Sequence, residues 1–485
     1  MVTSLVAGFL RGAAAQLGSD SMAIDETELR ARMRKLVASG ELLTDAAGRA
    51  RRYLADADDR PVAPTAGAVA ALERFREPLP ASVGDASEIL AMLDEVGSPG
   101  TVAQTGARFF GLVNGGMIPT AHAARVLADA WDQNAAVGAV SPTNAAIEET
   151  CQAWLRDLFG LPEHTVAGFV SGTSLAIVCG LAAARWRLCE RAGYDVNARG
   201  LADAPSLRIV ASRHAHSTVL KAVALLGFGT DNIEWAEVDD QGRLDPATLP
   251  ELDRHTILIL QAGNVNSGSF DPIRQCTDQA RRAGAWVHVD GAFGLWAAAC
   301  KSLAHLTDGH ELADSWSVDG HKTLNTPYDC GISLCADPEA MVASLQNSAP
   351  YIVASEHRDG MLYTPEMSRR ARAIDLWATL RYLGREGVDR MVLSLHQRTN
   401  QFAAELADAG FDVVNDVVFN QVMIRVGDQV ATDAFAAAVQ ASGEAWVGGS
   451  SWFGEPVIRI SVCSWMTASD DVSRAVRAMR QAHEL

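Results

Sequence analysis

The chain has 485 residues, enough for about two or three folded units and a large buried core. Its formal net charge is -18, which disfavours binding to nucleic acid or to an anionic membrane surface. No apolar run approaches the roughly 18 residues of a transmembrane helix, so we expect no membrane span. The eight cysteines are scattered without a C-x-x-C pair, which predicts buried thiols in a cytoplasmic protein and no metal site.

Three regions follow one another along the chain. Residues 1–107 are rich in alanine, arginine and acidic residues at helical spacing and predict a helical segment. In residues 108–361 short apolar runs alternate with helical segments, which predicts an α/β domain with a mostly parallel sheet. Residues 362–485 predict a smaller α+β domain. The expected strands are 167–171, 207–212, 256–261, 286–290, 331–335, 420–426 and 456–463, and the expected helices are 174–191, 217–226, 273–283, 369–385 and one after Thr467.

Polar clusters follow the first two strands of the expected α/β domain, at the sheet edge where such domains bind ligands. The segment SGTS at residues 171–174 opens a helix, so its small residues and the helix dipole suit a bound anion. A tight turn without a ligand would explain the same residues. His214 and His216 follow the second strand and suit an aromatic ligand or proton transfer, although a capping histidine is the plainer alternative.

A carboxylate and a lysine stand at later strand ends. Asp290 ends the apolar run WVHVD, and Ala292 leaves room above it, although a metal ligand or a helix cap would follow the same pattern. Lys322 lies in the small, polar segment SVDGHKTLN, where a buried amine would lose its charge and form a Schiff base with an aldehyde. An anion site, a ring-stacking residue, an acid and an amine are together the parts that pyridoxal 5'-phosphate (PLP) requires.

These residues lie in segments that resemble the group II PLP-dependent amino acid decarboxylases. HVDGAFG and SVDGHKTLNTPYDCG carry the resemblance most strongly, and AHSTVLKA, RFFGLVNGG, SPTNAAIEE and VIRISVCSWMT extend it across most of the chain. The resemblance implies an α/β fold of the PLP-dependent transferase type I, the aspartate aminotransferase type. It also implies a homodimer in which the N-terminal helices exchange with the partner subunit.

The resemblance implies a role for each matching residue. Lys322 bonds to the cofactor, Asp290 keeps the ring nitrogen protonated, and His216 stacks on the ring. The expected cofactor-binding set also contains Thr173, Ser174, Ala292, Asn266 and His321.

Three further positions bear on the reaction. Tyr351 matches the loop tyrosine that protonates the substrate carbon in the family, with an ordinary loop anchor as the alternative. Arg459 matches the arginine that binds the substrate carboxylate, with a structural ion pair as the alternative. Asp319 departs from the family, in which many relatives carry Asn three residues before the lysine. A carboxylate would repel the phosphate, so we assign Asp319 no phosphate contact.

The expected reaction is α-decarboxylation of an L-amino acid to the amine and CO₂. The expected catalytic residues are Lys322, His216, Tyr351 and Asp290. Aldehyde synthesis, transamination or carbon–carbon cleavage with the same cofactor are alternatives, and so is a PLP-fold scaffold without catalysis. Phe109 and Phe110 join Arg459 as expected substrate-binding residues and favour an aromatic substrate, although plain core packing would account for both rings.

Overall fold

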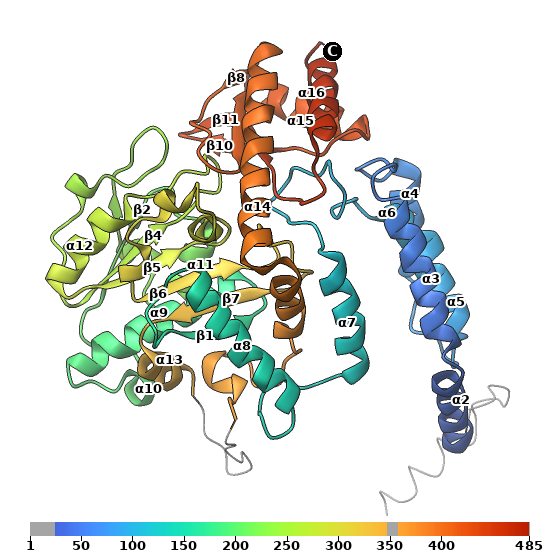
Figure 1. Ribbon diagram of the computed structural model, residues 1–485, viewed down its shortest axis with the longest axis horizontal. Helices are drawn as coiled ribbons and strands as arrows, with labels where there is room; N and C mark the ends of the chain where they lie inside the picture. The colour runs from blue at the N-terminus through green and yellow to red at the C-terminus, as the bar shows by residue number, and fades with distance from the viewer. Residues whose placement is uncertain (1–24, 347–356, 485) are drawn as a thin grey trace, which may run out of the picture. The chain divides into compact units, whose positions relative to one another are not determined.

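The computed structural model describes residues 25–346 and 357–484, which form two compact units (Figure 1). The first unit contains the chain up to Val102, except for the crossing segment Arg60–Ala63. That segment belongs to the second unit, together with Ala103 and the residues after it. Among the described residues no helix is long and apolar enough to cross a membrane. The limits expected at residues 107 and 361 stay predictions.

The first unit consists of helices joined by short turns. Gly40 separates its first two helices with φ 64°, a left-handed conformation that glycine adopts without strain. Asp85 caps another helix by accepting hydrogen bonds from the backbone N–H groups of Ser87 and Glu88 at 2.8 and 3.1 Å. The helices are α2 (Glu26–Ser39), α3 (Glu41–Ala55), α4 (Ala66–Ala71), α5 (Ala86–Met92) and α6 (Ser98–Gly100).

The centre of the second unit is a seven-stranded sheet in the order β1-β7-β6-β5-β4-β2-β3 (Figure 1). The strands from β6 to β3 are parallel, and β7 runs antiparallel between β1 and β6. The mostly parallel sheet expected from the sequence is therefore confirmed. The strands are β1 (Val166–Val170), β2 (Arg208–Ser212), β3 (Ile233–Ala236), β4 (Thr256–Gln261), β5 (Trp286–Asp290), β6 (Ser315–Asp319) and β7 (Gly331–Cys335).

Apolar residues alternate between the two faces of this sheet. In β4, Leu258 and Leu260 belong to one core cluster, whereas Ile257 and Ile259 belong to another. The first cluster includes residues of α8, α12 and α14, and the second includes residues of α9, α11 and α13. Helices therefore cover both faces, and the polar ligand-binding groups are left to the edge where the strands end. The helices are α7 (Pro119–Trp131), α8 (Pro142–Leu158), α9 (Thr173–Arg191), α10 (Val196–Arg199), α11 (Ser217–Leu225), α12 (Ile273–Ala283) and α13 (Pro338–Leu345).

A four-stranded antiparallel sheet in the order β10-β11-β9-β8 forms the C-terminal part of the second unit. Helix α14 links it to the large sheet. A kink at Gly384, where φ is 58°, divides α14 into two helical parts, and the first part ends close to the end of the helix expected at 369–385. The elements are α14 (Ala373–Asp408), β8 (Asp412–Val413), β9 (Gln421–Arg425), α15 (Gln429–Ala441), β10 (Gly448–Trp452), β11 (Glu455–Ser461) and α16 (Ser469–His483).

Candidate active site

A cavity of about 390 Å³ lies at the carboxyl ends of the large sheet's strands. Parallel topology predicts this location, because the loops that follow the strands diverge there. Most of the residues expected to bind the cofactor line it. Those lining residues are Thr173, Ser174, His216, Asp290, Ala292, His321 and Lys322, together with Asp319.

Lys322 is held by a carboxylate from the strand that precedes it. Asp319 ends β6 with a side chain only 2% exposed, and its Oδ2 lies 3.2 Å from the Lys322 amine nitrogen. The same oxygen lies 3.5 Å from His321 Nε2, while His321 Nδ1 accepts a hydrogen bond from the Cys330 backbone N–H at 3.0 Å. Burial lowers the pKa of His321. The amine is therefore fixed inside the cavity rather than free in solvent.

Asp290 lies at the end of the neighbouring strand β5 and is 5% exposed. Its Oδ1 accepts hydrogen bonds from the Ala292 backbone N–H at 3.2 Å and from the Ser317 hydroxyl at 3.3 Å. Burial raises the pKa of Asp290, and the nearby His216 and Lys322 oppose that rise. A cation such as a protonated ring nitrogen would therefore stabilise the ionised carboxylate at this position.

His216 begins helix α11 and caps it. Its Nδ1 lies 2.7 Å from the Thr218 hydroxyl oxygen and accepts a hydrogen bond from the Thr218 backbone N–H at 3.3 Å. Burial lowers the pKa of His216, and Asp290 opposes that effect. His216 therefore caps the helix, as the plainer alternative from the sequence expected. The cap also fixes the imidazole ring at the cavity wall.

The segment 171–174 begins helix α9 beside these groups. The Thr173 hydroxyl is buried and has no hydrogen-bond partner among the described residues. A Cβ added to Gly172 would lie 3.4 Å from His321 Cε1, so the backbone approaches the lysine segment closely. Free N–H groups, a helix dipole and an unpaired hydroxyl together suit a bound phosphate.

A second close approach fixes the lysine segment from its other side. A Cβ added to Gly115 would lie 2.1 Å from the Lys322 carbonyl oxygen, and the Gly115 N–H donates to the His321 carbonyl at 3.2 Å. The Asn325 side chain donates to the Thr323 and Cys463 carbonyl oxygens at 2.8 and 3.0 Å. The backbone around Lys322 is thereby attached to two other parts of the chain, at Gly115 and at Cys463.

Two further sequence-predicted residues, Asn266 and Arg459, are not part of the described cavity lining. Asn266 accepts a hydrogen bond from the Ser450 hydroxyl at 2.7 Å and joins β10 to the large domain rather than lining the cavity. Arg459 donates to the carbonyl oxygen of Val265, a cavity-lining residue, at 3.2 Å, and burial lowers its pKa. Its contact with a substrate carboxylate stays a prediction. Tyr351 lies outside the described residues.

Phe109 and Phe110 do not line the described cavity. Phe109 stacks on Trp446 with ring centroids 4.9 Å apart, and Phe110 packs edge-on against Phe402 in the C-terminal core. The aromatic substrate wall expected from these two rings is therefore corrected to core packing. Within the described lining, Leu112 and Val113 take that place, because the chain turns there with positive φ at both residues.

Other lining residues were not predicted. Gln261 lines the cavity from the end of β4, in the same way that Asp290 lies at the end of β5. A polar residue at the end of an apolar strand is the sequence pattern that could have predicted Gln261. Its Nε2 atom is buried without a hydrogen-bond partner among the described residues. Tyr328 stacks on His321 with ring centroids 4.2 Å apart, and no periodicity in its loop indicates that contact.

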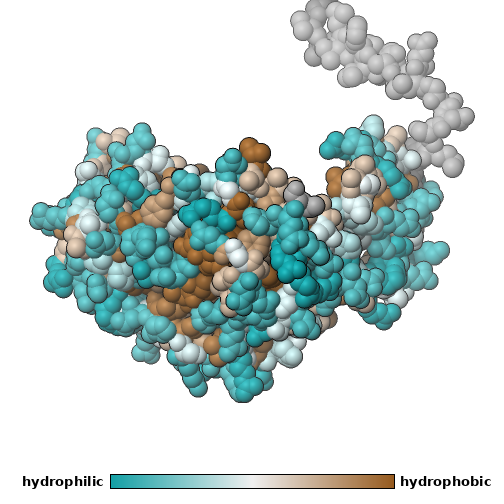
Figure 2. All heavy atoms as spheres, turned by 90° about the horizontal axis from the view of Figure 1, so that it is seen from above, coloured by the Kyte–Doolittle hydropathy of each residue, from teal (hydrophilic) through white to brown (hydrophobic). Residues whose placement is uncertain are grey.

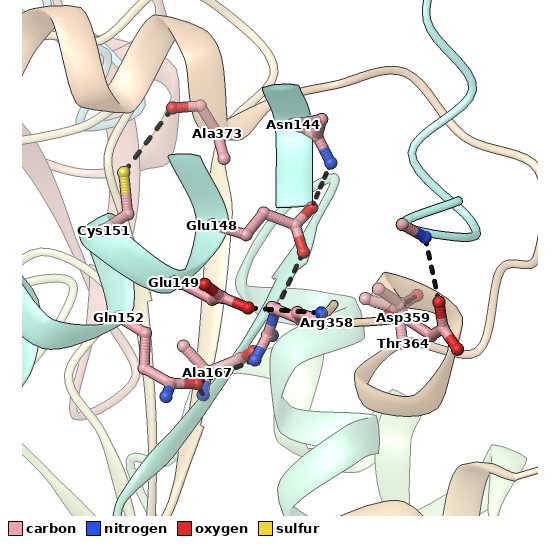
Figure 3. Close-up of polar contacts among 12 residues, drawn as sticks. Asn144, Glu148, Glu149, Cys151, Gln152, Ala167, Arg358, Asp359, Thr364 and Ala373 are labelled. Atoms are coloured by element: carbon pink, nitrogen blue, oxygen red, sulfur yellow. Dashed lines mark hydrogen bonds and ion pairs between the residues drawn. The ribbon is translucent and has the colours of Figure 1, made fainter. Parts of the chain in front are cut away.

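A buried charged cluster supports the strand that leads to the anion site (Figure 3). Arg358 donates to Glu148 at 3.1 Å and to Gln152 at 2.8 Å, and also to the carbonyl oxygen of Ala167 in β1. Arg369 donates to the other oxygen of Glu148 at 2.8 Å. The cluster fixes helix α8, strand β1 and the chain that follows the undescribed residues 347–356.

The described residues fit PLP. A phosphate suits the start of α9, where Thr173 has an unpaired hydroxyl, and an aldehyde suits the Lys322 amine in the same cavity. Asp290 supplies the buried carboxylate for a protonated ring nitrogen. His216 and Ala292 add an imidazole ring and a small side chain to the walls.

Comparisons with known proteins agree with this fit. The chain is 29% identical over 316 residues to an L-2,4-diaminobutyrate decarboxylase of Rhizobium meliloti, covering 61% of this chain and 60% of that protein. It is 30% identical over 257 residues to an aspartate 1-decarboxylase of Aliivibrio fischeri, covering 50% and 47%. The matches thus span about half to three fifths of the length of these relatives.

The fold also matches a solved structure. The Oryza sativa protein TDC, crystallised with PLP and tryptamine, superposes with a TM-score of 0.81 at 24% identity, covering 96% of this chain and 99% of that one. At this identity the likeness establishes the type I fold. A model of the pyridoxal-dependent decarboxylase conserved domain matches residues 76–426. The chain therefore belongs to the pyridoxal-dependent decarboxylase family and uses PLP as its cofactor.

Proposed function

We propose that this protein removes the α-carboxyl group of an L-amino acid as CO₂ and releases the amine. The observation that carries the proposal is one cavity with three groups: the Lys322 amine, the Asp290 carboxylate and the start of helix α9. These groups match the aldehyde, the ring nitrogen and the phosphate of PLP. The related diaminobutyrate and aspartate decarboxylases support the reaction class.

Each residue has a defined task in the proposed reaction. PLP, when bound, withdraws the electrons that the departing carboxyl group leaves behind. Lys322 provides the amine that bonds to the cofactor, and Asp290 places a negative charge beside the ring nitrogen to hold its proton. His216 supports the ring face, and Thr173 and Ser174 hold the phosphate through the start of α9.

Tyr351, which is not among the described residues, and Arg459 complete the proposal. Tyr351 gives a proton to the substrate α-carbon after CO₂ leaves, and its phenol is then reprotonated from solvent. Arg459 would bind and orient the substrate carboxylate. Support for Arg459 is its contact with the cavity-lining Val265 and its electrostatic influence on His216.

We propose a substrate with an uncharged, preferably aromatic side chain. In the described lining the acidic groups are Asp290 and Asp319 and the basic group besides the histidines is Lys322, all of which have partners or tasks. Leu112, Val113, Phe293 and Tyr328 supply apolar surface for a ring. An arginine for an acidic substrate side chain is not part of that described lining.

We further propose a cytoplasmic homodimer. Helix α7 exposes Val126, Leu127 and Trp131 at 57%, 56% and 46%, and its Arg125 donates to the carbonyl oxygen of the cavity residue Tyr328. Helix α7 thus presents exposed apolar side chains, and Figure 2 shows hydrophobic residues gathered on one face of the molecule. Such a patch suits a second copy of the chain. Eight buried free thiols suit a reducing compartment.

Release of CO₂ from a panel of the twenty common L-amino acids tests the proposal. We expect one or a few aromatic substrates to give CO₂ and amine in equal amounts. Lys322→Ala should abolish release, while Lys301→Ala, which removes an exposed lysine, should not change it. Aldehyde or keto acid in place of amine would favour the other PLP reactions, and no product from any amino acid would favour a scaffold. Light scattering of the purified chain tests the dimer.

A further inference from the structure

Asp319 is held rigidly at the point where the lysine segment meets the anion site. Its backbone N–H donates to the Ala292 carbonyl oxygen at 2.9 Å, and its own carbonyl oxygen accepts from Trp296 Nε1 at 2.9 Å. Asp319 is 2% exposed and is the last residue of β6, where it pairs with Gly331 of β7. The carboxylate therefore cannot swing out into solvent without disturbing the end of that strand.

The two oxygens of this carboxylate have different surroundings. Oδ2 faces the lysine amine, 3.2 Å from Lys322 Nζ, and lies 3.5 Å from His321 Nε2. Oδ1 is buried and has no hydrogen-bond partner among the described residues. A Cβ built on Gly172 would lie 3.7 Å from Oδ1, so this oxygen points towards the start of α9. A buried carboxylate oxygen without a donor is costly, and it lies beside the site proposed for a phosphate.

A phosphate at the start of α9 would meet both attraction and repulsion. The helix N–H groups and dipole attract it, and the hydroxyl of Thr173 can donate to it. The unpaired oxygen of Asp319 repels it, because two negative groups then share one water-poor cavity. Pairing of Lys322 with the other oxygen offsets part of this repulsion but gives Oδ1 no hydrogen-bond donor among the described residues.

We infer that Asp319 weakens the hold of the protein on the phosphate of PLP, so that cofactor exchanges readily and the active fraction follows PLP supply. This inference rests on the proposed cofactor position, with the phosphate at the start of α9. It concerns retention of the cofactor rather than the reaction, so it applies whichever amino acid is the substrate. Asp319 acts here as a charged neighbour of the phosphate.

Cofactor titration of the full-length apoprotein tests this inference with three ligands. PLP has the aldehyde and the phosphate, pyridoxine 5'-phosphate lacks the aldehyde, and pyridoxal lacks the phosphate. Asp319→Asn keeps the shape and removes the charge, and its amide can donate to a phosphate. We expect the dissociation constants of PLP and pyridoxine 5'-phosphate to fall about tenfold or more, and that of pyridoxal to stay unchanged.

Two further variants make the result decisive. Asp308→Asn removes one negative charge from an ion pair on the surface and should change none of the three constants. Asp319→Ser removes the same charge as Asp319→Asn and has a smaller side chain. It is used in place of Asp319→Asn if circular dichroism shows that Asp319→Asn does not fold. Unchanged or weaker PLP binding in the neutral variants would overturn the inference, and so would an equal gain for pyridoxal. Because binding is measured without substrate, a failure to release CO₂ would refute only the proposed reaction.

Discussion

Neutralising Glu148 should destabilise the protein far more than any single surface ion pair does. Its side chain is fully buried and accepts hydrogen bonds from Asn144 at 3.0 Å, Arg358 at 3.1 Å and Arg369 at 2.8 Å (Figure 3). Arg369 is 1% exposed, and its Nε and Nη1 atoms have no hydrogen-bond partner among the described residues. Glu148→Gln would therefore leave two buried guanidinium groups with no carboxylate of their own, at a cost of about 3–5 kcal/mol.

Urea denaturation of the full chain, followed by tryptophan fluorescence, measures that cost. Asp308→Asn is the matched control, because Asp308 bonds to Arg274 at 2.6 Å while the two side chains are 61% and 43% exposed. Exposed pairs contribute about 0–1 kcal/mol, so the control should unfold almost as the unaltered chain does. If Glu148→Gln costs no more than this control, the reasoning from buried charge is wrong.

A double variant separates stranded charge from lost packing. Removing Arg369 as well, in Glu148→Gln with Arg369→Gln, takes away one of the two cations that Glu148 balances. The double variant should then be more stable than the sum of the two single changes predicts, because neighbouring charges couple strongly. Strict additivity would mean that Glu148 acts by shape alone.

Three other perturbations test the site and its surroundings. Gly115→Ala places a Cβ 2.1 Å from the Lys322 carbonyl oxygen and should lower PLP occupancy, measured by absorbance, whereas Gly67→Ala meets no atom within 4 Å and should not. Tyr351→Phe should lower amine yield and divert product to aldehyde in the presence of oxygen, and an unchanged amine yield would contradict its proposed role. Burial lowers the pKa of His288 to about 3, so the unfolded chain takes up a proton that the folded chain refuses between about pH 6.5 and 3. The free energy of unfolding should thus fall by about 1.4 kcal/mol for each pH unit of acidification in this window, and His288→Gln should flatten that slope.

Polar residues at strand ends can be predicted from the sequence, because the apolar run of a buried strand stops at the residue where the polar side chain begins. Asp290 ends a strand that is buried throughout, so its position alone marks it as a group facing the cavity. The expected strands at 256–261, 286–290 and 331–335 match β4, β5 and β7 for the same reason. No bounds were expected for β6, although a strand end was expected before Lys322, because the two serines in its sequence interrupt the apolar run. Ser315 is tolerated there because Trp286 Nε1 and His288 Nδ1 each lie 2.9 Å from its hydroxyl, contacts that no local pattern encodes.

The surroundings of a residue whose partners are distant in the chain cannot be predicted from a local sequence pattern. Glu148 lies on α8 in the segment SPTNAAIEE, where an acidic residue next to another acidic residue indicates a solvated helix face. Its burial depends on Arg358 and Arg369, which arrive from more than 200 positions later in the chain. Asp319 is a second example. The sequence shows that an aspartate stands where many relatives carry asparagine, but only the structure shows that its Oδ1 has no hydrogen-bond partner among the described residues and faces the start of α9. Sequence therefore identifies which groups can do chemistry, whereas the balance of charge around each of them is set by the packing of remote segments.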